Sequence, residues 1–407
     1  MGTIVVRNPT TGEVEKAAET AAKAFPSLSL EHWQQDFHLV ARVFGERFIL
    51  VGELDGEIVS SLLCHPGPIY RGGSKVPHSA VGAVGTAPEH RRKGCAGALM
   101  AECVRMLRGE GICLSSLWPF SFEYYRRFGW EVGAEERRYE AEGRVFAGLE
   151  GKGDVRAAGE RDTAGIKDLY DSFAPRFSCL TVRSDEWWRE VVELPGALGR
   201  EAPAPGHGAA VCEDSGQTAA YAVYKMSEGE NGARIDIKEL AWRETRHRRA
   251  ILRFFGNACP EARIRYTAPA SDLFLAELPN PDAVECRAKA SFAFRVVDPA
   301  MAMEFLVPDT PARASFTLSI RDPVFTQGFE FGVLADGDRV SLTEPGRGGS
   351  LRMSVQTLAQ LYSGRLTLIQ ALELGLVDTQ GMNRESLAAA AAVFGTAHPY
   401  RTGLEPG

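Results

Sequence analysis

The first part of the chain alternates between short apolar runs and segments with one apolar face. Val14, Ala18, Ala21 and Phe25 fall on one side of a helix over residues 12–25, which is the spacing of an amphipathic helix. Apolar and β-branched runs that end at turn residues are typical of strands. The pattern predicts the order β-α-β-β-β-α-β-α, in segments 3–9, 12–25, 47–66 (a hairpin), 78–88, a helix after Gly94, 111–119 and 122–130.

Two further segments with their own patterns follow this unit. Residues 150–162 are polar and contain glycine, which is typical of a linker. Residues 155–295 give helices and strands in a similar order, so we interpret them as a degenerate repeat of the first unit. From about residue 296, three or four strands come first and helices follow, an order that predicts an α+β layer. The fold class is therefore α/β and α+β, with expected domains at 1–148, 149–295 and 296–407.

Composition places the chain among ordinary globular proteins. Its 407 residues are 44% hydrophobic and 24% charged, so each expected domain can bury a core of its own. A net charge of −7 argues against nucleic acid as a partner. No apolar run approaches the ~18 residues of a membrane span, and no signal peptide is evident. We therefore expect no membrane partner and a cytoplasmic location.

The 8 cysteines are scattered along the chain without a CxxC pair. This distribution fits neither a zinc site nor a disulfide framework. His65, His78 and His90 show no metal-ligand spacing. The sequence therefore predicts reduced, mostly buried thiols and no metal site.

Residues 83–100, AVGTAPEHRRKGCAGALM, carry the chemistry of the first unit. A strand ends here, three basic residues follow, and a helix begins whose first turn has only small side chains. Free N–H groups at a helix start and the helix dipole together favour anions. The stretch therefore favours a pyrophosphate site, and the alternative is a basic helix start with a small packing face. Neither a GxxxxGK[ST] loop nor a GxGxxG loop opens this helix.

Residues 91–96, RRKGCA, resemble the [QR]xxGx[GA] loop of the GNAT superfamily of N-acetyltransferases, which holds the pyrophosphate of acetyl-CoA. Together with YYRRFGW at 124–130, the surrounding stretch resembles the Eis (enhanced intracellular survival) family. The resemblance implies tandem GNAT folds, the first active and the second degenerate, followed by a sterol-carrier-like domain. It also implies acetyl-CoA as cosubstrate and assembly as a homohexamer.

By this resemblance, the acetyl-CoA site is made by a strand end, the loop and helix start after it, and two residues after the next strand. The implied residues are Val84, Gly85 and Thr86; Arg92, Lys93, Gly94, Cys95, Ala96 and Gly97; and Phe120 and Ser121. Backbone N–H groups at the strand end are implied to pair with the pantetheine arm and to contact the acetyl carbonyl. The family often has Ser-Glu where this chain has Phe120 and Ser121.

Acetyl transfer to an amine needs a base for the ammonium and an acid for the departing thiolate. Tyr125 matches the YxRFG[YW] tyrosine that the family uses as general acid. The alternative is that Tyr125, like its neighbour Tyr124, is a packing residue. The family uses its terminal carboxylate as general base, which here implies Gly407, and the alternative is a frayed tail. Glu405 is expected beside Gly407 in the pocket, where it favours a cationic amine.

These observations predict an N-acetyltransferase that acts on the amine of a cationic small molecule, aminoglycoside-like or polyamine, or on lysine. The alternative is a non-catalytic protein, either regulatory or binding acyl-CoA or a lipid, motivated by Phe120, Ser121 and the unusual C-terminus.

Overall fold

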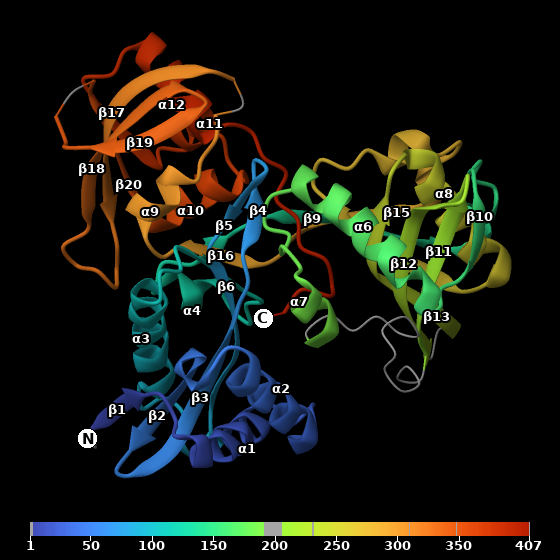
Figure 1. Cartoon of the computed structure of the whole chain (residues 1–407), viewed down its shortest axis with the longest axis horizontal. Helices are drawn as coiled ribbons and strands as arrows, with labels where there is room; N and C mark the ends of the chain where they lie inside the picture. Colours follow the sequence, from blue (N-terminus) through green and yellow to red (C-terminus); the bar gives the residue numbers. More distant parts are fainter. Residues whose placement is uncertain (1–2, 191–205, 230–231, 309, 347, 407) are drawn as a thin grey trace. The chain divides into compact units, whose positions relative to one another are not determined.

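The computed structural model describes residues 3–190, 206–229, 232–308, 310–346 and 348–406, which form two compact units (Figure 1). The first unit contains 3–133, 292–397 and 406. The second contains the described residues of 134–291 together with 398–405. Each unit is therefore built from segments that are far apart in the sequence.

The first unit contains a mixed sheet with the strand order β1-β2-β3-β6-β7-β16-β8. Its strands are β1 Ile4–Arg7, β2 Ile49–Leu54, β3 Glu57–Pro66, β6 His78–Thr86, β7 Leu114–Leu117, β16 Ala293–Val296 and β8 Glu131–Val132. Strands β6 and β7 run parallel, whereas the other neighbours are antiparallel. A small ribbon of β4 Ile69–Arg71 and β5 Ser74–Val76 lies between β3 and β6 in the sequence.

Helices cover both faces of this sheet. They are α1 Val14–Ala24, α2 Leu30–Val43, α3 Cys95–Gly109 and α4 Phe122–Arg126. On one face, Ser61 of β3 donates a hydrogen bond to the Ala17 carbonyl of α1 at 3.0 Å. On the other face, the neighbouring Ser60 and Leu99 of α3 lie against Gly52 of β2. The predicted helices at 12–25 and after Gly94 are confirmed, whereas α2 and β8 are absent from the predicted order.

A second sheet of the first unit has the order β19-β18-β17-β20-β21 (Figure 1). Its strands are β19 Arg339–Thr343, β18 Phe329–Gly337, β17 Ala312–Arg321, β20 Ser350–Ser354 and β21 Val377–Gln380. The helices of this part are α9 Pro299–Glu304, α10 Val355–Ser363, α11 Leu368–Glu373 and α12 Arg384–Phe394. The predicted α+β layer is thereby confirmed.

Two buried arginines tie the segments of the first unit together. Arg295 forms an ion pair with Asp322 at 2.6 Å, with both side chains 0% exposed, and also donates to the Phe128 carbonyl. Arg71 donates to the Tyr362 carbonyl at 2.5 Å. A buried guanidinium is tolerated only when such partners replace its hydration. These contacts therefore make the segment 292–397 part of the first unit.

The second unit contains a sheet with the order β10-β11-β12-β13-β14-β9-β15. Its strands are β10 Asp154–Ala157, β11 His207–Asp214, β12 Gln217–Gly229, β13 Gly232–Trp242, β14 Arg263–Pro269, β9 Glu135–Glu142 and β15 Glu285–Ala290. Its helices are α5 Gly143–Ala147, α6 Thr163–Phe173, α7 Asp185–Glu190 and α8 Thr245–Ala258. The parallel pair β13 and β14 is connected by α8, as β6 and β7 are connected by α3. The repeat predicted from element order is therefore confirmed.

Two strands lie in sheets that the order of segments alone does not indicate. Strand β9, at 135–142, is inserted between β14 and β15 in the sheet of the second unit. Strand β16, at 293–296, is inserted between β7 and β8 in the first sheet. The expected boundaries at 148 and 295 remain a prediction about where independently folding domains divide.

The C-terminal segment 398–405 is anchored within the second unit. The Ser178 backbone donates to and accepts from this segment at 3.0 and 2.9 Å. Glu405 forms an ion pair with Arg183 at 2.8 Å, and both side chains are 0% exposed. The expectation that Glu405 lies in the acetyl-transfer pocket is therefore wrong, because its carboxylate is buried against an arginine of the second unit. The alternative of a frayed tail does not hold for these residues.

Among the described residues, no helix is both long enough and apolar enough to cross a membrane.

Candidate active site

Strands β6 and β7 separate at one end of the first sheet. They pair over residues 78–80 of β6, whereas β6 continues to Thr86. On its other side β6 stays paired with β3 through a register shift, and Ala83 has a φ of +53°. No described strand pairs with residues 84–86 on the side of β7. Backbone groups along this edge are therefore available to a ligand.

Helix α3 begins after a turn with left-handed backbone. Arg92 has a φ of +63°, and Gly94, the N-cap residue, has a φ of +94°. Glycine adopts this conformation without steric cost because it has no Cβ. The N-cap makes no side-chain hydrogen bond, and the first turn contains no acidic residue. The first N–H groups of α3 therefore lack a side-chain cap, which together with the helix dipole makes an anion site.

The strand edge and the helix start face one cleft of about 720 Å³. Its lining residues are Ala24, Phe25, Val84, Gly85, Thr86, His90, Arg91, Arg92, Gly94, Cys95, Ala96, Gly97, Phe120, Tyr124 and Arg127. Three arginines and no carboxylate stand in this lining, so the cleft favours an anionic ligand.

Two hydroxyl groups in the wall of the cleft are buried without a partner. They are Oγ1 of Thr86 and the hydroxyl of Tyr124, and neither has a hydrogen-bond partner among the described residues. A buried polar group without a hydrogen bond costs about 1–3 kcal/mol. A ligand with polar groups along its length would satisfy both hydroxyls, and the pyrophosphate and pantetheine arm of acetyl-CoA are such a ligand.

The structure brings the predicted cofactor residues together, except for two. Lys93 does not line the cleft; its Nζ lies 3.3 Å from Nδ1 of His90. Ser121 caps α4, because its hydroxyl accepts a hydrogen bond from the Tyr124 amide at 3.2 Å. Gly407, the predicted base, lies outside the described residues. The assignment of individual site residues stays a prediction.

Sequence reasoning missed part of the lining. Ala24 is the last residue of α1 and Phe25 follows it, and no motif connects them with the loop after β6. Arg127 is part of the YYRRFGW stretch but carried no predicted role. Tyr124 was expected to be a packing residue, yet its side chain lines the cleft. Each of these residues reaches the site through folding rather than through sequence spacing.

The two tyrosines of α4 have different environments. Tyr125 is 3% exposed and belongs to the core cluster of the first unit, and its ring lies 5.2 Å from that of Tyr124. Burial raises the pKa of Tyr125 above its usual value, and the neighbouring Tyr124 raises it further. Burial also raises the pKa of Tyr124. Phe120, which is 71% exposed, packs against both rings at the rim of the cleft.

The start of α8 in the second unit is filled by protein groups. Arg248, in the first turn, is buried and forms ion pairs with Asp272 and Glu277. His247 lies 3.1 Å from Asp214 through its Nε2. The carboxylates of Asp272 and Glu277 already neutralise Arg248, so a phosphate at this helix start would compete with them, which supports the expectation of a degenerate second domain.

Comparison with known proteins decides the family. Residues 5–133 match an acetyltransferase (GNAT) domain family, residues 179–296 match a second acetyltransferase (GNAT) domain family, and residues 297–402 match a sterol carrier protein domain family. The chain is a GNAT N-acetyltransferase. The predicted order of two GNAT domains and a sterol-carrier-like domain is confirmed. GNAT domains imply the use of acetyl-CoA, and acetyl transfer implies an acceptor substrate.

Relatives of this acetyltransferase match most of its chain, and solved structures share its fold. A Streptomyces griseus protein described as an uncharacterized N-acetyltransferase is 25% identical over 372 residues, covering 82% of each chain. A GCN5-related N-acetyltransferase from Anabaena variabilis has a TM-score of 0.83 at 17% identity, with 98% of each chain covered. Eis1 from Mycobacterium abscessus has a TM-score of 0.73 at 20% identity, covering 98% of this chain and 99% of that one. The predicted Eis-like fold is thereby confirmed.

Proposed function

We propose that this enzyme transfers the acetyl group of acetyl-CoA to the amine of an aminoglycoside-like or polyamine molecule, or to a lysine side chain. The cleft of the first unit carries the proposal, because it joins an open strand edge, an uncapped helix start and two unpartnered hydroxyls. Bound acetyl-CoA supplies an acetyl group activated as a thioester. The helix start and Arg92 would hold its phosphates, and residues 84–86 would hold its pantetheine arm.

The reaction forms a C–N bond to the acceptor and breaks the C–S bond of the thioester. Two protons must leave the acceptor nitrogen, one from the ammonium before it attacks and one as the amide forms, and one proton must reach the sulfur. We assign the proton for the sulfur to the Tyr125 hydroxyl. Its raised pKa, above the ordinary value of about 10, keeps it protonated throughout the neutral range. The carboxylate of Gly407 is the proposed general base, on the family resemblance.

A screen of thiol release tests the acceptor class. Aminoglycosides, polyamines and lysine peptides are each offered with acetyl-CoA, and free thiol is measured against time. Turnover with at least one of these amines is expected. Binding of acetyl-CoA without thiol release for any of them would contradict the proposal and support the non-catalytic alternative.

A pair of tyrosine variants tests the acid. Tyr125→Phe is expected to lower kcat by roughly 10²–10⁴-fold, the usual contribution of general acid catalysis, and Tyr124→Phe by only a few-fold. The two rings are neighbours in one helix, so the second variant is a matched control. Full turnover by Tyr125→Phe, or a larger loss in Tyr124→Phe, would show that Tyr125 is not the acid.

Extension of the chain by one glycine tests the base. The extension converts the Gly407 carboxylate into a peptide group and moves the terminal charge by up to about 3.6 Å. We expect kcat to fall by about a hundredfold or more, whereas Gly407→Ala keeps a terminal carboxylate and serves as control. Unchanged turnover in the extended chain would eliminate this assignment.

Assembly as a homohexamer and a cytoplasmic location stay predictions from the resemblance and the sequence. Light scattering of the purified protein tests the first, because a monomer would contradict it.

A further inference from the structure

One face of the sheet in the second unit carries a concentration of arginines. Directly opposed residues on neighbouring strands share a face. Arg138 lies opposite Arg287, and Glu140 lies opposite both Arg265 and Glu285. The other face of these strands is core, as shown by Tyr139, Ile235 and Ile264, which are at most 1% exposed.

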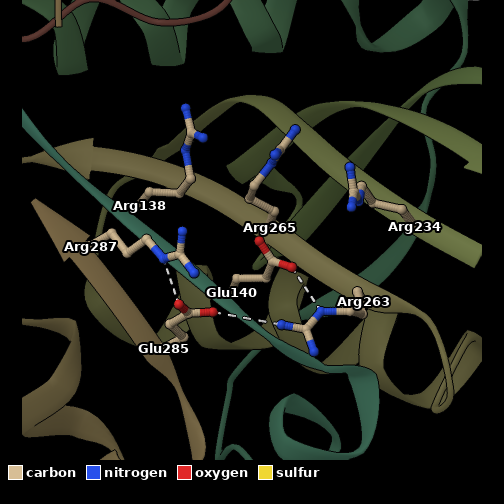
Figure 2. A pocket seen from close by; sticks show the side chains of 7 residues that line it. All are labelled: Arg138, Glu140, Arg234, Arg263, Arg265, Glu285 and Arg287. Atoms are coloured by element: carbon tan, nitrogen blue, oxygen red, sulfur yellow. Dashed lines mark hydrogen bonds and ion pairs between the residues drawn. The ribbon is translucent and has the colours of Figure 1, made fainter. Parts of the chain in front are cut away.

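These charged side chains surround a cavity of about 360 Å³ (Figure 2). Five arginines and two glutamates line it, which leaves an excess of three positive charges. The arginines are Arg138, Arg234, Arg263, Arg265 and Arg287. Every lining residue is charged, so the cavity offers neither an aromatic nor an aliphatic surface for an apolar ligand.

The two glutamates neutralise only part of this charge. Glu140 pairs with Arg263 at 2.7 Å, and Glu285 pairs with Arg287 at 2.5 Å and with Arg263 at 3.8 Å. The carboxylates of the cavity are therefore occupied by two of the five arginines.

The remaining three guanidinium groups rise from the same side of the sheet in Figure 2. Arg265 has one ion pair, through Nε to Asp236 at 2.7 Å, and Arg138 has a long one of 3.6 Å to Glu136. Arg234 has no carboxylate within ion-pairing distance among the described residues. Because each guanidinium carries five N–H donors, many donors remain for a ligand.

We propose that this cavity binds a compact oxyanion with two or more negative charges, of the phosphate or pyrophosphate class. Arginine forks match the oxygens of such anions in bidentate hydrogen bonds. An anion also offsets the repulsion between arginines that oppose each other across strands, such as Arg138 and Arg287. The volume lies near the lower end of ligand pockets, of roughly 300–1,000 Å³, which suits a small ligand. The site is separate from the acetyl-transfer cleft and does not depend on the proposed acceptor.

Calorimetric titration of the full chain with inorganic pyrophosphate tests this site. Saturating acetyl-CoA is kept in both solutions, so that the anion site at the start of α3 is occupied. One pyrophosphate is expected to bind per chain, with an affinity that falls as salt rises. Arg234→Gln should weaken binding by about tenfold or more, the scale of a lost hydrogen bond to a charged group.

Arg313→Gln is the matched control, because this arginine lies in the first unit with a side chain that is 92% exposed. It should leave the affinity within about twofold of wild type. Arg138→Gln provides a second lining variant, and it is expected to weaken binding like Arg234→Gln. An unchanged midpoint of urea unfolding in each lining variant shows that the second unit, which carries the cavity, is still folded.

Parallel titrations with inorganic phosphate and with glycerol 3-phosphate identify the source of the anion. Tighter binding of the first supports a free oxyanion, and tighter binding of the second supports a phosphoryl group on an organic molecule. Absence of pyrophosphate binding to the wild type would overturn the proposal. So would unchanged binding in both lining variants, or binding only to phosphatidylglycerol vesicles.

Discussion

Replacement of Arg183 by methionine should destabilise the second unit through two buried carboxylates. The Arg183 guanidinium bridges Glu239 and Glu405 at 2.7 and 2.8 Å, and all three side chains are at most 1% exposed. Arg401 reaches Glu405 only at 3.9 Å. Methionine fills much of the same volume but supplies no charge, so both carboxylates lose their closest cation.

The magnitude follows from the burial of the cluster. Removal of one partner of a buried ion pair costs about 3–5 kcal/mol. The upper end applies here because two carboxylates are affected. The hydroxyls of Thr402 and Tyr221 still donate to Glu239, each at 2.6 Å, which keeps the cost within that range. Glu405→Gln leaves the pair of Arg183 with Glu239 intact and should cost about 1–3 kcal/mol.

The dependence of stability on pH distinguishes the loss of the Arg183 ion pairs from a simple packing defect. Burial raises the pKa of Glu239, but the charge and hydrogen bonds of Arg183 outweigh it, so the pKa lies below its usual value. A depressed folded-state pKa contributes stability above the unfolded pKa of about 4.3 that is lost as the pH falls. Without Arg183, burial raises the pKa instead, and stability should then decrease as the pH rises through the new folded-state value. The variant should therefore lose less stability than the wild type between neutral and acid pH.

Urea unfolding followed by tryptophan fluorescence measures this change. The Arg183 guanidinium lies 4.8 Å from the ring centroid of Trp188, so the signal reports on the affected region. Arg313→Met, at an exposed pair with Asp336, is the control and should change stability by less than about 1 kcal/mol. A loss below about 1 kcal/mol in Arg183→Met, or equal sensitivity of variant and wild type to acid, would refute the reasoning.

Three further predictions concern the first unit and the thiols. Gly129→Ala should lower the free energy of unfolding by about 3 kcal/mol or more, because Gly129 has a φ of +90° and an added Cβ would collide with the buried guanidinium of Arg295. Thermal unfolding measures this loss, and Gly109→Ala, with open space at its Cβ, is the control. Arg92→Asn keeps a residue that tolerates positive φ and should raise KM for acetyl-CoA about tenfold with kcat nearly unchanged, so an unchanged KM in steady-state kinetics would contradict its role. Iodoacetamide at pH 8 should modify Cys286, which is half-buried, well before Cys113, because burial and then Asp298 raise the pKa of Cys113 to about 12. Peptide mass spectrometry against time would expose the reverse order.

The local sequence pattern was sufficient to predict most helices and strands and the motif residues of the candidate site. The helix after Gly94 and the strand before it were predicted because their periodicity and their glycine are local features. The motif residues from Val84 to Gly97 also lie close together along the chain, so their resemblance to a known loop was visible without a fold.

Features that depend on residues far apart in the sequence were not predicted. Phe25 reaches the cleft because α1 packs on the sheet beside β6, and Tyr124 lines it because α4 follows the next strand. Strands β9 and β16 were not predicted, and hydrogen bonding places β9 in the sheet of the second unit and β16 in the first sheet. A strand's local pattern sets its two faces but not its neighbours.

The sequence by itself determined most of the elements, the three-part order and the loop that we propose to bind pyrophosphate, since these depend on short-range periodicity and conformational preference. Tertiary structure alone decided the position of Glu405, which lies buried on Arg183, and the arginine cavity of the second unit. The charged side chains of this cavity come from four strands, and the sequence shows no pattern that connects them. Only strand register brings them to one face, and only burial decides which charges find partners.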